Sequence, residues 1–189
     1  MFHPSPRHAD TSGMRRRPNR VAVIGDVHAC DRRLDLLLTH LDEQELEMVA
    51  CVGDIVDGPG DPDATAALRD LPASVDVKLA DGTRLVLCHG LLDNDMNKIT
   101  ADDYGYALEV NDELQSLLRD RRPCVVVKGH RHRPAIWTVG RLTLVDAGSL
   151  LEESQTCAVI VDANERTVTP IAVGRDGVKH WHQAPLFQA

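Results

Sequence analysis

An aspartate and a histidine follow the first strongly apolar run of the chain, and this pair most constrains what the chain can build. Residues 21–24 read Val-Ala-Val-Ile and end at a glycine. Such a short, partly β-branched run bounded by glycine predicts a buried strand. Asp26 and His28 come directly after it. A carboxylate and an imidazole at the end of one strand can turn into one cleft, and both are ligands for divalent transition metals.

The next two segments predict that a second strand returns to the same place. Leucines at helical spacing in residues 31–41 predict an amphipathic helix, and residues 48–52 predict a strand that ends at Asp54. The order strand, helix, strand implies two parallel strands with a right-handed crossover. Ligands of open α/β sheets bind at the carboxyl ends of the strands. Asp54 is therefore expected near Asp26 and His28.

Further apolar runs also end in histidine. A strand over residues 84–88 leads to His89, and a strand over 125–127 leads to His130 and His132. One such residue is weak evidence, but several on one predicted sheet edge are hard to assign to chance. Side chains two positions apart on an extended segment point to opposite sides, so these last two imidazoles can reach two different ions, or one can bind an ion while the other supports its ligands. Other strands are predicted over 75–79, 136–139, 142–145, 157–161 and 167–173, and helices over 64–71 and 101–119.

Composition and charge exclude several classes of protein. The chain has 189 residues with 43% hydrophobic residues, which suits one domain with a sizeable core. Its net charge of -8 argues against general nucleic-acid binding. No apolar run approaches the roughly 18 residues of a membrane span. Five cysteines without a Cys-x-x-Cys motif indicate a reduced, cytoplasmic protein.

The predicted domain covers residues 20–175. Residues 1–19 are expected to be a disordered basic leader, or to follow a start codon placed too early, and a phosphate-binding or lipid-binding tail is the less favoured alternative. Residues 176–189 are expected to be a C-terminal tail without a clear pattern.

Four motifs in order resemble the calcineurin-like metallophosphoesterase family. They are GDVH at 25–28, GDIVDGPG at 53–60, CHG at 88–90 and GHRH at 129–132. The resemblance spans about residues 20–175 and implies an α/β fold, a two-sheet β-sandwich flanked by helices (αββα).

The resemblance also implies roles for individual residues. One metal would be held by Asp26, His28 and His132, Asp54 would bridge to a second metal, and that second metal would be held by His89 and His130. Asp57 would support this shell.

Beside these ligands, arginines adjoin the histidine pair. Arg131 and Arg133 could clamp phosphate oxygens, although solvent-facing charges are an equally good reading. Asp54, Asp57 and Arg131 are thus the predicted catalytic residues.

The implied activity is hydrolysis of a phosphate monoester or diester by a metal-activated water at a di-metal centre. The expected cofactors are two divalent ions, with Mn²⁺ the first choice over Fe²⁺, Zn²⁺ and Co²⁺. A small phosphate ester or a nucleotide is the expected partner, and no membrane is expected to take part. Phosphomonoesters, phosphodiesters, nucleotide pyrophosphates and phosphoproteins all fit such a cleft.

One family motif is missing. The family carries Gly-Asn-His-(Asp/Glu) between the second aspartate motif and the isolated histidine, whereas residues 61–87 contain neither His nor Asn. The second metal site therefore lacks a ligand and is expected to be weak. The chain could instead be a degenerate, non-catalytic member that binds metal or a partner, or the gap could be an error in the gene sequence.

Four polar residues after His89 are candidates to replace the missing motif, and the sequence leaves two interpretations of them open. Asp93, Asn94, Asp95 and Asn97 could fill the gap or be ordinary solvated loop residues. The turn at residues 146–149 could brace the histidine pair or be a plain turn.

Overall fold

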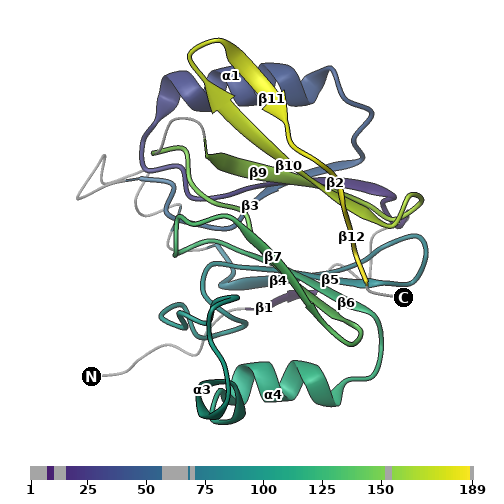
Figure 1. Ribbon diagram of the computed structural model, residues 1–189. Coiled ribbons are helices and arrows are strands. Elements are labelled where there is room, and N and C mark those ends of the chain that lie inside the picture. Colours follow the sequence, from purple (N-terminus) through teal and green to yellow (C-terminus); the bar gives the residue numbers. More distant parts are fainter. Residues whose placement is uncertain (1–7, 11–15, 57–67, 69–70, 152–154, 188–189) are drawn as a thin grey trace.

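Two β-sheets face each other in the computed structural model, which describes residues 8–10, 16–56, 68, 71–151 and 155–187 (Figure 1). Sheet A contains, in spatial order, β1 (His8–Asp10), β4 (Ser74–Lys78), β5 (Arg84–Cys88), β6 (Cys124–Lys128), β8 (Leu142–Asp146) and β7 (Ala135–Val139). Sheet B contains β11 (Gly177–His180), β10 (Thr167–Gly174), β9 (Thr156–Asp162), β2 (Arg20–Ile24) and β3 (Met48–Cys51), with β12 (Ala184–Pro185) beside β10.

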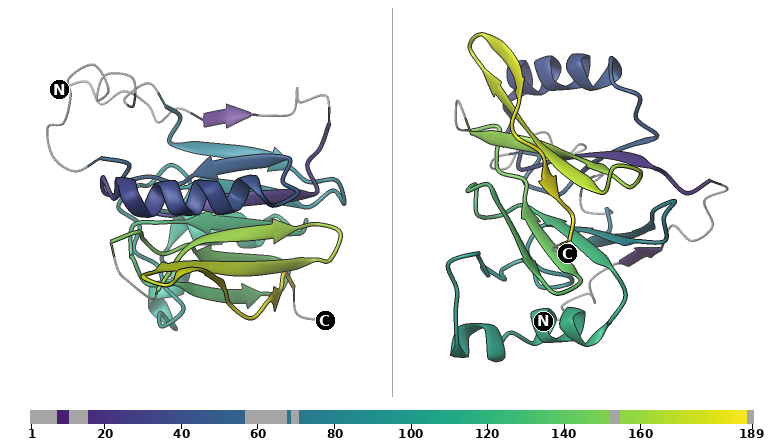
Figure 2. Two further views of the ribbon diagram at one scale, coloured as in Figure 1. Left: turned by 90° about the horizontal axis from the view of Figure 1, so that it is seen from above. Right: turned by 45° about the vertical axis from the view of Figure 1, so that its right-hand side comes forward.

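Helices cover the outer faces of both sheets. Helix α1 (Asp31–Asp42) lies against sheet B, and α4 (Asp112–Arg119) lies against sheet A after the short α3 (Tyr106–Glu109). Figure 2 shows the same layers from two further directions, with α1 running along the strands of its sheet. The predicted helix-flanked sandwich is therefore confirmed.

Successive residues of a central strand pack into different hydrophobic clusters on the two faces of its sheet. In β2, Val21 and Val23 belong to the core between the sheets, whereas Ala22 and Ile24 pack beneath α1. In β5, alternate residues face the central core and the cluster under α4 in the same way. Successive side chains of a strand point to opposite faces, so a strand covered on both faces is apolar throughout.

The local pairings follow the sequence expectations. Strands β2 and β3 are parallel neighbours joined through α1, and β4 and β5 form an antiparallel hairpin. Strands β9 and β10 form a second antiparallel pair. One expectation needs correction, because the ligand-bearing strands do not share one sheet. Strands β2 and β3 lie in sheet B, whereas β5 and β6 lie in sheet A.

The predicted helix over 101–119 is wrong in its first part. Gly105 has φ of 57°, and Asn111 begins α4 by accepting a hydrogen bond from the Leu114 N–H. Before Gly105 the chain forms a local turn, in which Asp103 accepts a 2.7 Å hydrogen bond from the backbone N–H of Thr100. The left-handed glycine and the internal cap divide the segment into two short helices.

The sheets also extend beyond the limits expected for the domain. Strand β1 lies within the expected leader and pairs with β4, and β11 and β12 lie within the expected tail and pair with β10. The helix expected over 64–71 lies mostly outside the described residues.

The five cysteines give a direct test of the packing. Burial raises the pKa of Cys88 and Cys124 to about 12 and that of Cys157 to about 11. Desolvation also raises the pKa of Cys51, but Cys51 is exposed and Cys30 half-buried, so a reagent can reach both thiols. Because the thiolate is the reactive form, we expect two thiols to react with a thiol reagent in the native protein. The other three should react only after unfolding, and rapid native labelling of all five would contradict this packing.

Candidate metal centre

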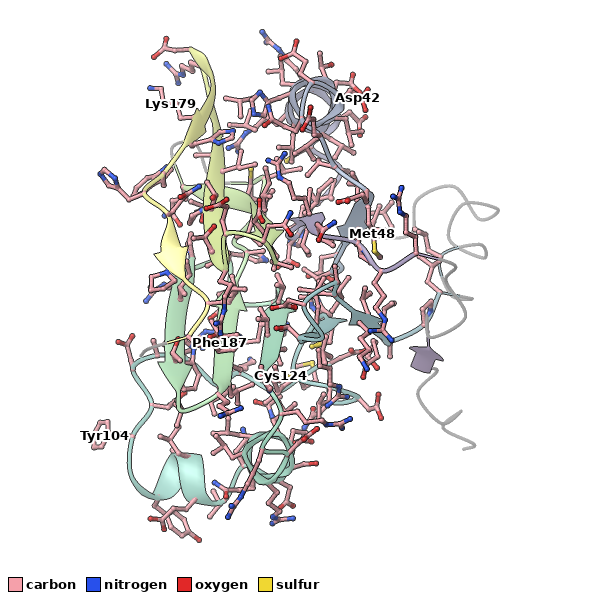
Figure 3. The ribbon with its side chains drawn as sticks, turned by 90° about the vertical axis from the view of Figure 1, so that its right-hand side faces the viewer. Asp42, Met48, Tyr104, Cys124, Lys179 and Phe187 are labelled. Carbon is pink, nitrogen blue, oxygen red and sulfur yellow. The ribbon has the colours of Figure 1, made fainter. Side chains whose placement is uncertain are left out.

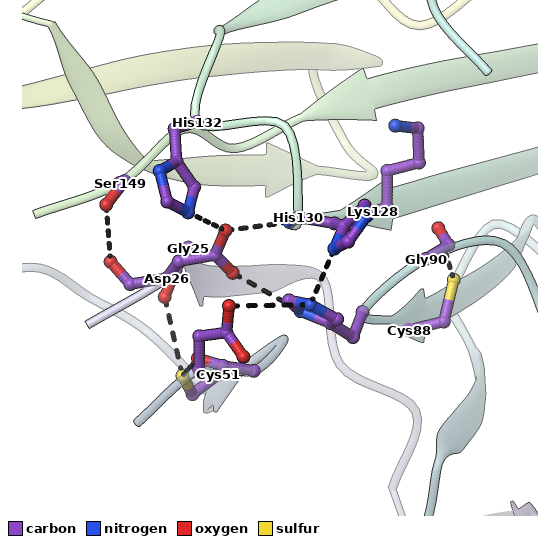
Figure 4. A network of polar contacts seen from close by, with 12 residues as sticks. Gly25, Asp26, Cys51, Cys88, Gly90, Lys128, His130, His132 and Ser149 are labelled. Carbon is purple, nitrogen blue, oxygen red and sulfur yellow. Dashed lines mark hydrogen bonds and ion pairs between the residues drawn. The ribbon is translucent and has the colours of Figure 1, made fainter. Parts of the chain in front are cut away.

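Asp26 lies in the middle of the polar network of the candidate centre and links loops of the two sheets (Figure 4). Its carboxylate is fully buried, and Oδ2 accepts a 2.7 Å hydrogen bond from the backbone N–H of His130 in the loop after β6 of sheet A. Its own N–H donates to the carbonyl of Gly148. Its carbonyl accepts from the N–H of Leu150 and from the hydroxyl of Ser149. The turn after β8 thus supports Asp26 directly.

Asp54 and His28 belong to neighbouring loops of sheet B that are joined through their backbones. The carbonyl of Asp54 accepts hydrogen bonds from the N–H groups of Val27 (3.1 Å) and His28 (2.7 Å). The side chain of Asp54 is 43% exposed and that of His28 only 12%. Asp54 Oδ2 lies 3.6 Å from Nε2 of both His28 and His89. It therefore reaches residues predicted for the first ion and residues predicted for the second.

Two glycines let these loops approach each other. A Cβ added at Gly129 would collide with the carboxylate of Asp26, and one added at Gly53 would collide with the ring of His89. Each glycine directly precedes a candidate ligand. The glycines of GHRH and GDIVD are therefore needed for space at the centre.

The two histidines after β6 turn to different partners, as the i, i+2 spacing predicted. Nε2 of His132 lies 2.9 Å from Nε2 of His28, and the planes of the two rings meet at 76°. Nδ1 of His130 lies 3.2 Å from Nε2 of His89, with the rings at 80°. The six side chains predicted as ligands thus lie in one connected group.

The residues fit a divalent ion. Ligand atoms of Asp26, His28, Asp54 and His132 all lie within 4.8 Å of one another. Two carboxylates and two imidazoles form a donor set that suits Mn²⁺, Fe²⁺, Zn²⁺ or Co²⁺. Buried Asp26 Oδ1 and His89 Nδ1 lie 3.4 Å apart as an ion pair, but neither has a hydrogen-bond partner within the described part of the chain. A buried polar atom without a partner is costly, and a cation beside these atoms would supply one.

Left-handed backbone occurs at four of the candidate ligands. The φ angles are 51° at His28, 38° at Asp54, 71° at His130 and 53° at His132. Such conformations cost non-glycine residues on the order of 1–3 kcal/mol each and gather at functional sites. The hydrogen bonds of Asp26 and Asp54 with the neighbouring loops hold these backbone conformations in place.

The charges around the second histidine pair act in opposite directions. Burial alone would lower the pKa of His89, but its contact with Asp26 and then the charges of Asp54 and Asp95 raise it. Burial, the charge of His89 and the charge of Lys98 lower the pKa of His130. A lowered pKa keeps His130 neutral, which is the form that binds metal.

Most of the polar loop after His89 is engaged elsewhere. Asp93 accepts a hydrogen bond from Ser74 of β4. Asn94 and Asn97 both donate to Glu113 of α4. Three of the four residues considered as substitutes for the missing motif therefore bind other parts of the fold, and only Asp95 acts on the centre, through its charge.

A buried ion pair that no sequence motif indicated lies directly before GHRH. Lys128 ends β6, Asp146 ends β8, and the two are register partners that form an ion pair while 0% and 3% exposed. Desolvation raises the pKa of Asp146 to about 6, against the opposing charge of Lys128. The sequence could have indicated this pair, because a lysine follows the apolar run Val125–Val127 and an aspartate ends the neighbouring parallel strand.

Two predicted catalytic residues remain untested. Asp57 lies outside the described residues. Arg131 is half-buried, and its charge, like that of Lys128, opposes the rise that burial causes in the pKa of Asp146. A role for Arg131 in binding phosphate stays a prediction.

Two sequence profiles of known protein families match the chain. The sequence profile of the calcineurin-like phosphoesterase superfamily domain matches residues 55–166, and that of the calcineurin-like phosphoesterase domain matches residues 19–79. The chain belongs to the calcineurin-like phosphoesterase family. No curated protein matches the chain in sequence.

Solved structures of this family share the fold. Yfce, a phosphoesterase from E. coli, is 16% identical with a TM-score of 0.57, and the match covers 88% of this chain and 99% of that one. Vps29 from Entamoeba histolytica complexed with Zn²⁺ is 16% identical with a TM-score of 0.56, over 88% and 99% of the chains. Vps29 from Chaetomium thermophilum complexed with a cyclic peptide is 16% identical with a TM-score of 0.52, over 88% and 96%.

At these identities the likeness shows the fold alone. Within the described residues, no helix is long and apolar enough to cross a membrane.

Proposed function

We propose that this member of the calcineurin-like phosphoesterase family is a metal-dependent phosphoric ester hydrolase. The proposal rests on one observation, the convergence of four strand ends from two sheets on a group of carboxylates and imidazoles (Figure 4). When bound, two divalent ions, Mn²⁺ first among them, supply Lewis acidity toward phosphate oxygens and acidify a water nucleophile.

The chain itself supplies position and charge. Asp26 is held by both sheets in the middle of the centre, and Asp54 lies toward its mouth between the two histidine pairs. His28 and His132 would hold the first ion, and His89 and His130 would hold the second. A substrate phosphate would enter beside Asp54, the most exposed of these carboxylates.

The chain offers no family-type histidine to protonate the leaving group. General acid catalysis contributes typically about 10²–10⁴-fold. The activity is therefore expected to be weak and to favour esters with good leaving groups. An aryl phosphate and a bis-aryl phosphate are suitable probes, because their leaving groups need little help from an acid.

The decisive assay measures turnover of both probes with Mn²⁺ and with EDTA. Turnover should depend on Mn²⁺ and disappear in Asp54→Asn, which keeps the shape of the side chain but not its charge. Activity that survives both EDTA and Asp54→Asn would belong to a contaminant, and the proposed function would fail.

Lys98 is expected to help bind the substrate. It is the single lysine or arginine in residues 89–118, and its exposed side chain stands between the buried residues Asn97 and Ile99. Its charge already acts on His130. Lys98→Met should reduce kcat/KM for aryl phosphate about tenfold, on the scale of one partly screened charge contact.

Salt dependence separates this effect from a structural one. The loss in Lys98→Met should shrink at high ionic strength, because salt screens exposed charges. Lys179→Met, on exposed β11, is the matched control and should leave kcat/KM unchanged. Equal losses in both variants would remove Lys98 from the substrate-binding surface.

A non-catalytic role is the second candidate. The absence of His and Asn from residues 61–87 favours it, and a Vps29 of the same fold is known in complex with a cyclic peptide. Binding of Mn²⁺ to the centre without turnover of either probe would favour this alternative.

A further inference from the structure

A third pair of histidines lies outside the candidate centre. His40 is in the last turn of α1, and His180 ends β11. Their Nε2 atoms are 2.7 Å apart, and the ring centroids are 5.0 Å apart with the planes at 84°. The two pairs within the candidate centre have nitrogen separations of 2.9 and 3.2 Å and plane angles of 76° and 80°. The third pair therefore has the geometry of the two candidate ligand pairs.

Packing on both sides holds the two backbones in place without help from the imidazoles. Leu37 and Leu41 of α1 are buried in a cluster against which Val178 of β11 packs. Arg33 of α1 donates a 2.7 Å hydrogen bond to the carbonyl of Val173 in β10. Figure 3 views α1 end-on near Asp42, with β11 and Lys179 alongside. The histidines thus stand at the rim of a formed interface.

The surroundings suit neutral imidazole ligands. Burial lowers the pKa of His180, and the charges of His40 and Arg20 lower it further. Beside His180 the surface is hollowed between β10 and the segment that follows β11, with Lys179, Trp181 and His182 among the lining residues. Water can therefore reach an ion at this place and complete its coordination.

We propose that His40 and His180 form a separate metal site that takes one Zn²⁺, Ni²⁺ or Cu²⁺ ion and clips β11 to α1. Imidazole suits these ions, whereas Mn²⁺ prefers carboxylate and water oxygens. His40 follows the start of α1 by nine residues, which is roughly 14 Å along a helix. Since α1 begins beside His28, the clip lies at the far end of the helix and does not depend on the proposed hydrolase activity.

The competing explanation is a plain hydrogen bond, in which one ring donates and the other accepts. Glutamine distinguishes the two, because its amide can donate and accept but is a poor ligand for these metals. The test set is therefore wild type, His40→Gln and His180→Gln. His182→Gln serves as the matched control, since it removes an exposed histidine from the same hollow.

The experiment compares melting temperatures and bound nickel in the Mn²⁺-saturated proteins before and after addition of NiCl₂. Any exchange at the candidate centre is common to all four proteins, so differences report on the clip. At nickel concentrations about 100-fold above Kd, binding favours the folded state about 100-fold, which raises Tm by several degrees in a chain of this size.

Wild type and His182→Gln should show this rise and one additional nickel per chain, and both should be lost in His40→Gln and His180→Gln. Equal nickel responses in all four proteins would overturn the proposal and leave the pair as a hydrogen bond. A response lost in His182→Gln but kept in His40→Gln would overturn it as well.

Discussion

Replacing Asp26 by asparagine is expected to abolish metal binding and phosphoesterase activity together, while the metal-free protein stays at least as stable. The carboxylate is fully buried, and its Oδ1 lies 3.4 Å from Nδ1 of His89 without a hydrogen-bond partner. The amide oxygen of asparagine can still accept from the N–H of His130, but the charge that attracts the cation is gone. Loss of groups that merely support metal ligands costs about 10–100-fold in affinity, so loss of this ligand should cost more.

The melting temperature of Asp26→Asn tests the assignment as directly as its activity does. A buried carboxylate without full pairing is destabilising, and proteins keep such groups where function needs them. In EDTA, Asp26→Asn should therefore melt at or above the wild-type temperature. With Mn²⁺, the wild type should gain stability and the variant should not. Asp35→Asn, on the exposed side of α1, should behave as wild type throughout.

A Mn²⁺-dependent rise in Tm that survives in Asp26→Asn would contradict the assigned centre. A variant that fails to fold in EDTA would show instead that Asp26 is chiefly a link between the sheets. Gly129→Ala distinguishes these cases, because its methyl group displaces the carboxylate without removing it. It should lower Mn²⁺ affinity even though all six candidate ligands remain.

Breaking the buried pair before GHRH is expected to have the largest effect on stability. Lys128→Met leaves Asp146 buried without its cation. Removal of one partner from a buried ion pair typically destabilises by about 3–5 kcal/mol. Exchange of both partners for apolar residues of similar volume is often neutral. Lys128→Met/Asp146→Leu should therefore recover most of the free energy of unfolding lost in the single variant.

Urea unfolding at two pH values checks the physical cause. The pKa of Asp146 is already raised to about 6 by burial, and loss of the lysine charge raises it further. A raised pKa in the folded state means that protonation stabilises the fold, so the deficit of Lys128→Met should be smaller at pH 5 than at pH 8. If the free energy of unfolding of Lys128→Met is within about 1 kcal/mol of the wild-type value, roughly a third of the expected loss, the ion pair contributes little to stability.

The sequence alone determined the strands and the residues that end them. The run 21–24 and the leucines of 31–41 act through local rules of periodicity, and each gives the expected element. Local rules also predict the parallel pairing of β2 and β3, since two strands joined by a single helix usually lie parallel with a right-handed crossover connection. The candidate ligands could be found because they come directly after such runs.

Local rules failed where a distant contact decided the outcome. The segment 101–119 has helical spacing, yet Asn97 reaches Asn111 across the loop and the helix begins there instead. The expected tail joins sheet B because β10 offers it an edge. Neither interaction is visible in a window of neighbouring residues.

The centre itself was decided by the tertiary structure. The sequence predicted one sheet edge, but the ligands come from two sheets that pack against each other through their inner faces. Asp26 joins them because its carboxylate bonds to the loop after β6, while its backbone bonds to the turn after β8. Motif and spacing select residues able to bind a metal, whereas burial and contacts between the sheets determine which of their atoms converge.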